Sequence, residues 1–241
     1  MIDPLYARLG AYAALDEADF SPLRAAAFEP ALYDRGAAVI EIATALTHVF
    51  VVAQGWAIRY RLLEDGRRQI VNVMLPGDCF DLQAMIAAKA DHGVEAVTAL
   101  DVMRAPKARF LGAIRANGRL ATAFWWTAVQ EESILREQIV RLGRRSGRAR
   151  IAHLFLELQR RRTLAGLAGG DMLPMPLTRD MLADMLGLSP VHVSRSLSAL
   201  KRAKLIALQS GGVVLLDRRG LAALAQFDPT YLHADAMARL A

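Results

Sequence analysis

Residues 189–200 combine hydrogen-bonding side chains with an apolar helical spacing. The apolar positions that share one side of the expected helix are Val193, Leu197 and Leu200. The small or hydrogen-bonding residues expected to face outward are His192, Arg195, Ser196 and Ala199, with Ser189 and Ser194 near the edge. An outward arginine can donate two hydrogen bonds to O6 and N7 of guanine. The expected chemistry is therefore contact with base edges in the major groove of DNA.

The elements around this helix have the signals needed to position it. Thr178 is expected to cap a preceding helix, with Asp180 in its first turn and a buried face at four positions: Met181, Leu182, Met185 and Leu186. Gly187 ends that helix, and Ser189 caps the next one with Pro190 at its first position. Residues 205–208 and 213–216 then predict a two-stranded wing. This order predicts a winged helix-turn-helix; the alternative is an ordinary amphipathic helix pair in an α-rich core.

Positive charge is concentrated around this predicted motif. The net charge is +6. Residues 1–135 carry 13 Lys/Arg against 16 Asp/Glu, whereas residues 136–220 carry 16 against 6. A basic excess confined to the motif indicates a surface for phosphate. The run Arg160-Arg161-Arg162 is expected to be a solvated helix face.

The N-terminal half is typical of β-structure. Strands are expected within residues 37–42, 48–63, 69–75, 94–100 and 102–105, with Asp101 as a break. Short strands at such spacing predict a sandwich or barrel-like roll, a shape that often encloses a small ligand. Residues 4–34 are expected to be helical or irregular.

A long helix is expected from residue 120 to 145, with a coiled-coil seam along it. The seam residues recur at alternating steps of four and three, with one polar interruption at Glu132: Ala121, Trp125, Ala128, Glu132, Leu135, Ile139 and Leu142. A seam favours a homodimer, and the alternative is a helix packed on its own roll. Both hold together if Phe124 or Trp126 turns toward the roll and the seam toward a partner. The expected domains are a sensor roll over 1–118, a dimerisation helix over 119–146 and a DNA-binding domain over 147–241.

Composition argues against several other classes. The single cysteine, Cys79, excludes an internal disulfide framework, and no apolar stretch approaches a membrane span or a signal-peptide layout, so a cytoplasmic protein without a membrane is expected. The five histidines lack paired metal-ligand spacing, which argues against a metalloenzyme of the roll type. His153 is expected in the core. Cys79 is either a buried strand residue or a redox or haem-binding thiol.

The order of β-roll, long helix and winged helix-turn-helix resembles the Crp/Fnr family, that of the cyclic-AMP receptor protein and the fumarate-nitrate regulator. The similarity covers about residues 36–224 and is most specific over 55–80 and 178–205. It implies an α+β chain that acts as a homodimeric transcription regulator, binds a near-palindromic operator in double-stranded DNA and contacts RNA polymerase.

The resemblance also implies roles for individual residues. Thr178 and Arg179 match phosphate contacts at the start of the first helix, and Ser189 matches one in the turn. The family's base-reading positions are occupied by Ser194 and Arg195, and His192 is expected on the same DNA-contacting face. Both well-known branches have a glutamate where this chain has Val191, which can touch a thymine methyl but cannot accept from cytosine. A different operator sequence is therefore expected.

The sensor half departs further from the family pattern. Cyclic-nucleotide binders have Phe-Gly-Glu where this chain has Phe80-Asp81-Leu82, and an arginine with Ser or Thr near residues 90–93, which here are Ala-Asp-His-Gly. This argues against cyclic AMP, and one cysteine cannot hold a [4Fe–4S] cluster. The effector stays unidentified. Two alternatives stay open: a regulator of the same fold without an effector, and a small-molecule enzyme on a β-roll with an accessory helical domain.

Overall fold

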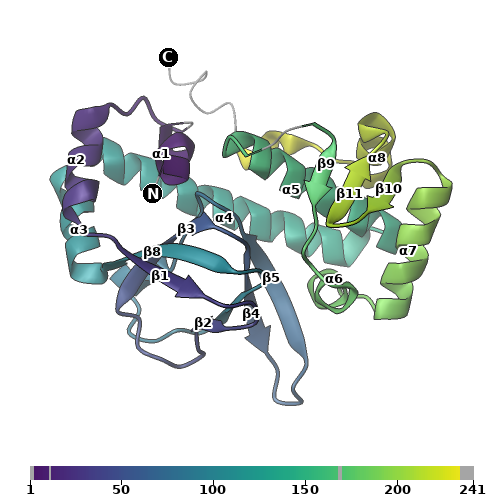
Figure 1. Ribbon diagram of the computed structural model, residues 1–241, viewed down its shortest axis with the longest axis horizontal. Coiled ribbons are helices and arrows are strands. Elements are labelled where there is room, and N and C mark those ends of the chain that lie inside the picture. The colour runs from purple at the N-terminus through teal and green to yellow at the C-terminus, as the bar shows by residue number, and fades with distance from the viewer. Residues whose placement is uncertain (1–2, 11, 168–169, 234–241) are drawn as a thin grey trace.

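A computed structural model describes residues 3–10, 12–167 and 170–233 (Figure 1). The helical elements are α1 Asp3–Gly10, α2 Glu17–Ala25, η1 Leu82–Met85, α3 Lys107–Ala116, α4 Gly118–Arg144, α5 Gly147–Leu164, α6 Arg179–Leu186, α7 Pro190–Arg202, α8 Arg218–Ala225 and η2 Pro229–Leu232. The strands are β1 Glu29–Tyr33, β2 Ala38–Ile40, β3 His48–Gln54, β4 Ala57–Leu62, β5 Arg68–Met74, β6 Cys79–Phe80, β7 Gly93–Ala96, β8 Leu100–Pro106, β9 Met172–Pro174, β10 Ile206–Gln209 and β11 Gly212–Leu215.

The N-terminal half is a β-roll of two four-stranded antiparallel sheets, ordered β1–β8–β3–β6 and β2–β7–β4–β5. Gly55 makes the tight link from β3 to β4. Its φ is +89°, and a Cβ there would lie 2.3 Å from the Ala99 carbonyl oxygen, so no other residue fits this turn. The predicted roll and the α+β class are confirmed.

Two details of the predicted roll are wrong. Asp101 does not interrupt a strand, because it pairs with Leu32 and Gln54 inside β8. Its side chain is partly exposed, and a polar residue facing outward does not break the ladder. The segment 4–34 is not only helical or irregular, since β1 extends the first sheet along β8. The largely exposed residues of β1 gave no alternating apolar signal.

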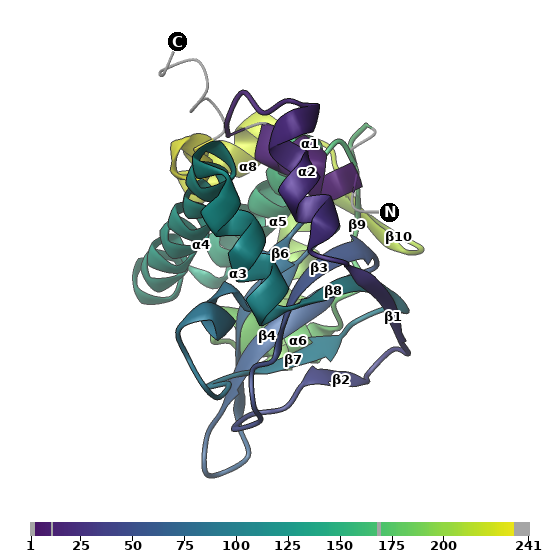
Figure 2. The same cartoon turned by 90° about the vertical axis from the view of Figure 1, so that its left-hand side faces the viewer.

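Helix α4 runs beside the roll, with α1–α3 gathered near its N-terminal end (Figures 1 and 2). Asn117 caps it by accepting a hydrogen bond from the Leu120 N–H at 3.0 Å. Phe124 packs edge-on against Phe110 of α3 inside the core of the roll. Of the two residues expected to turn toward the roll, Phe124 is the one that does, and the Trp126 ring lies against His233, with 5.8 Å between ring centroids.

The C-terminal part contains α5, the pair α6–α7 and a small wing sheet. The wing has three strands in the order β10–β11–β9, one more than expected. β9 lies before α6 in the chain and pairs with β11, a non-local partner that local sequence patterns do not reveal. No helix in the described ranges is long and apolar enough to cross a membrane.

Part of the second sheet shares a hydrophobic cluster with the C-terminal part, apart from the main core of the roll. Ile58, Ile70 and Val73 of the second sheet belong to the same buried cluster as Ile151 of α5 and Leu182 of α6. The cluster therefore crosses the expected boundaries between domains and fixes α6 against the roll.

A buried ion pair crosses the same contact. Arg161 is only 4% exposed, and its Nη2 donates to Asp78 Oδ2 and to the Val73 carbonyl, both at 2.7 Å. The expectation that Arg161 belongs to a solvated face is wrong, because a buried carboxylate on the roll provides its partner.

Candidate nucleic-acid interface

The turn between α6 and α7 forms as its sequence predicts. Thr178 Oγ1 accepts from the Met181 N–H at 3.2 Å, and Ser189 Oγ accepts from the His192 N–H at 3.2 Å. Gly187 ends α6 with φ 60° and ψ 44°, a left-handed conformation that suits glycine. Local capping thus sets the angle at which α7 leaves the protein.

Helix α7 has one buried side and one exposed side. The predicted core residues Val193, Leu197 and Leu200 are buried. The exposed residues of its outer side and of its capping turn are Ser189, Val191, His192 and Arg195, and Ser194 and Ala199 are partly exposed. Ser194 Oγ donates to the Pro190 carbonyl at 3.0 Å, so the α7 backbone already uses this hydroxyl proton.

Ser196 is a correction to the expected outward face. It is only 3% exposed and packs toward the start of α5, where a Cβ on Gly147 would lie 3.1 Å from its hydroxyl and 2.6 Å from His192 Nε2. Gly147 is therefore required for the close approach of α5 and α7. The serine fills that contact instead of facing outward.

Free positive charge borders α7. Arg148 lines a shallow hollow of about 340 Å³ along its outer side, together with Val191, His192 and Arg195. In the described part of the chain, neither Arg148, Arg179 nor Arg195 forms an ion pair with a carboxylate. Exposed guanidinium groups without a carboxylate partner are available to phosphate or base edges.

Sequence reasoning missed Arg148 and a second residue of α5. Arg150 Nη1 donates to the Leu186 carbonyl at 2.8 Å, and its Nε donates to the Arg145 carbonyl at 2.9 Å. It thereby satisfies the free carbonyl at the end of α6 and holds the turn. The sequence signal was Ser146, which caps α5 and places both arginines in its first turn.

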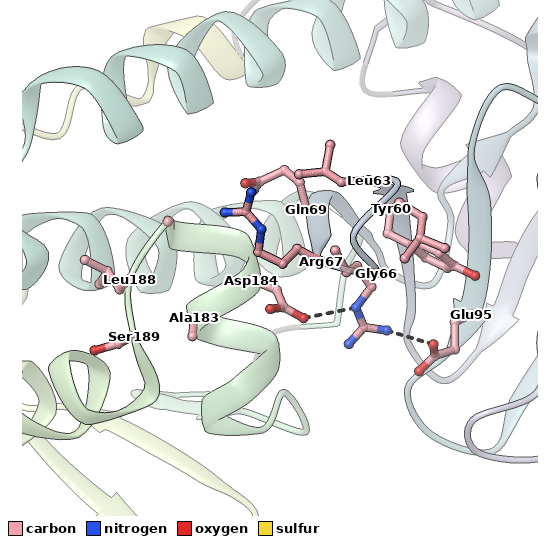
Figure 3. A pocket seen from close by; sticks show the side chains of 13 residues that line it. Tyr60, Leu63, Gly66, Arg67, Gln69, Glu95, Ala183, Asp184, Leu188 and Ser189 are labelled. Atoms are coloured by element: carbon pink, nitrogen blue, oxygen red, sulfur yellow. Dashed lines mark hydrogen bonds and ion pairs between the residues drawn. The ribbon is translucent and has the colours of Figure 1, made fainter.

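A cleft of about 890 Å³ separates the roll from α6 and reaches Ser189 at the start of α7 (Figure 3). Arg68 of β5 crosses it, with its Nε 3.0 Å from Asp184 and its Nη1 2.9 Å from Glu95; these are the dashed lines in Figure 3. Gln69 Nε2 also donates to the Met185 carbonyl at 3.2 Å. The sensor strands therefore hold the helix that precedes the turn.

The expected dimerisation seam lies on a face of α4 that the described part of the chain leaves exposed. Trp125 is 74% and Ile139 71% exposed, and Leu135 is 37% exposed. Ala128 and Glu132 are exposed, and the two end positions, Ala121 and Leu142, are partly exposed. Glu132 pairs with Arg136 on the same helix surface.

Charged side chains fill the space between the roll and α4. Asp81 is 1% exposed and takes the left-handed φ of 61°. Its Oδ1 lies 2.9 Å from His92 Nε2 and 3.6 Å from an Arg59 nitrogen, and Arg59 also pairs with Glu131 of α4. A hollow that Glu131 lines together with Arg8, Asp78 and Arg161 measures about 20 Å³, room for about one water molecule.

Cys79 lies in β6 and lines the same small hollow. Burial raises the pKa of its thiol above the ordinary value. A thiol with a raised pKa is a poor nucleophile and metal ligand. Within the described ranges, no three His, Cys, Asp or Glu side chains gather as a metal site.

Known proteins share both halves of this architecture. Residues 31–117 match the model of the cyclic nucleotide-binding domain, and residues 149–224 match that of the Crp-like helix-turn-helix domain. The nitrogen fixation regulation protein FixK of Bradyrhizobium diazoefficiens is 37% identical over 74% of this chain and 74% of its own length. The chain belongs to the Crp/Fnr family of transcription regulators.

Other members of the Crp/Fnr family agree with this assignment. The transcriptional activator protein FnrL of Cereibacter sphaeroides is 33% identical over 73% of this chain and 72% of its own length. The structure of FixK2 from Bradyrhizobium japonicum superposes with a TM-score of 0.75 at 28% identity, covering 82% of this chain and 97% of that one. These relatives are regulators, so the expectation that this chain is not an enzyme is confirmed.

Proposed function

We propose that this Crp/Fnr regulator binds its operator as a homodimer and inserts the N-terminal half of α7 into the major groove. The outer side of α7 carries the proposal: Arg195, His192 and Val191 are exposed together, and so is the N-cap residue Ser189 that precedes them. Arg195 and Ser194 read bases, with Val191 against a thymine methyl and His192 beside them. Phosphates are bound by Thr178, Arg179 and Ser189 at the two helix starts.

The homodimer forms through the α4 seam. Exposed Trp125, Leu135 and Ile139 form an apolar stripe that a second copy of the helix would cover. Pairing two chains presents two copies of α7 to two half-sites, so the operator is nearly palindromic. As a regulator of transcription the dimer works in the cytoplasm, beside RNA polymerase.

The sensor roll responds to an effector other than a familiar cyclic nucleotide. The Asp81–His92–Arg59 network fills the space beside α4, and a hollow of about 20 Å³ is far below the roughly 300–1,000 Å³ of small-molecule sites. The same filled space favours a second candidate, a regulator of this fold that needs no effector.

A DNA titration at increasing salt tests the proposed function. Fluorescence anisotropy with a selected operator should give two chains per duplex, and the logarithm of the affinity should fall linearly with that of the salt concentration because phosphate contacts release counterions. One chain per duplex, or an affinity independent of salt, contradicts the proposal.

A further inference from the structure

The roll has a second hollow, separate from the filled space beside α4. It measures about 380 Å³. Its walls come from strands β2 and β8, from the last residue of β1 and from the first residues of β3. No residue from η1 or α4 lines it. Its volume lies within the range of small-molecule sites.

Arg104 of β8 provides the charge in this hollow. Its Nε is buried without a hydrogen-bond partner, and in the described ranges no carboxylate lies within 4.0 Å of its guanidinium group. Glu29 stands directly opposite on β1, yet its side chain is exposed and forms no ion pair there. A partly buried arginine without a counter-ion is stabilised by an anionic ligand.

The neighbouring His48 adds no second charge. Burial, and then the nearby charge of Arg104, lower the pKa of His48 below its ordinary value, so its ring is neutral at pH 7. Exposed Glu41 also lines the hollow and, with Glu29, disfavours a multiply charged ligand. The balance of charge therefore suits one negative charge.

Apolar side chains form much of the remaining wall. Phe50, stacked on Phe80 with centroids 5.1 Å apart, lines the hollow together with Tyr33, Ile40 and Leu46. Thr44 and Thr47 share the wall with these apolar side chains, so the hollow can take a short apolar chain beside one charged group.

We propose that this hollow binds a small monocarboxylate with an apolar body, its carboxylate on the guanidinium of Arg104. A ligand in this site would be an effector of the sensor roll. Only its effect on DNA binding rests on the proposed function; the binding itself does not. The site lies apart from the Asp81 network, so a ligand there leaves the closed space beside α4 intact.

Calorimetric titration of the full chain with hexanoate tests the site. Hexanoate should bind saturably at one site per chain. Hexan-1-ol lacks the charge and acetate lacks the apolar body, so each should bind at least about tenfold more weakly than hexanoate. Arg104→Gln should weaken hexanoate binding by about tenfold or more, and Glu29→Gln should strengthen it by removing a competing carboxylate. Arg115→Gln, an exposed arginine of α3 outside the hollow, should leave it unchanged.

Equal binding of hexanoate and hexan-1-ol by the unaltered chain overturns the proposal, whether or not Arg104→Gln folds. Cyclic AMP binding that Arg104→Gln abolishes would overturn the ligand class. Hexanoate binding is measured without DNA and operator binding without hexanoate, so either this site or the proposed function can fail alone.

Discussion

Arg195 stands on the exposed side of α7 with its guanidinium free of carboxylates in the described chain. Replacing it with alanine removes the donors for guanine O6 and N7, so Arg195→Ala should weaken specific binding by about 1–3 kcal/mol and relax the preference at one base pair. Competition among operator variants measures both effects. Arg202→Ala, at the end of the same helix, should weaken all sequences alike; unchanged base preference in Arg195→Ala contradicts its reading role.

His153 links a single residue to the pH dependence of stability. Burial, reinforced by Arg141 and Arg145, lowers the pKa of His153 to about 2 in the folded chain. Below about pH 6.5, the ordinary pKa of histidine, the unfolded chain protonates His153 whereas the folded chain does not. The free energy of unfolding therefore falls by about 1.4 kcal/mol for each pH unit below about 6.5. Denaturant titrations at pH 7.5 and 5.5 should show this loss, and His153→Gln should lack this part of it. An identical loss in both proteins rules out His153 as its source.

Residues whose roles are set by immediate neighbours were predictable, and those set by distant partners were not. Thr178, Gly187 and Ser189 act within four residues of themselves, so their capping roles could be predicted from the sequence. Ser196 and Arg161 were assigned to exposed faces because their partners, near Gly147 and at Asp78, lie far away in the chain.

At the scale of elements, the spacing of apolar residues along α4 gives the plainest prediction of a partner helix. Its expected bounds, 120–145, agree with Gly118–Arg144 because amphipathic spacing and the Asn117 cap are local. β1 and β9 were missed because short strands owe their existence to pairing with β8 and β11. The proposed binding hollow could not be predicted either, since its lining residues Arg104 and Phe50 come to face each other only where β8 pairs with β3 in the folded sheet.

A charge in the α4 seam tests this element directly. Leu135→Glu places a second carboxylate beside Glu132 on the apolar stripe, so it should convert the dimer to a monomer and weaken operator binding together. Leu32→Glu alters an apolar residue of β1 that is 76% exposed and outside the seam, and should change neither property. Sedimentation velocity decides the matter: a Leu135→Glu protein that stays dimeric refutes the seam.

At the scale of the whole molecule, the roll and the DNA-binding part behave as one body held by a shared hydrophobic cluster and by Arg68. Arg68→Gln removes the ion pair with Asp184 that joins the roll to α6, together with the pair to Glu95 inside the roll, so amide hydrogen exchange in α6 should speed up relative to the native chain. Arg67→Gln provides the matched control because, among the described residues, Arg67 forms its ion pair with Asp65 in its own hairpin and none with α6. Equal exchange in α6 for the two variants would mean that Arg68 does not hold this helix.

Selection of binding sites from random duplexes tests the central claim most directly. Two copies of α7 on one dimer should enrich two-fold symmetric sites whose half-sites are centred about 34 Å apart, one helical turn. Enrichment of a single asymmetric half-site, or of no sequence at all, would contradict a dimeric regulator that reads DNA through the outer side of α7.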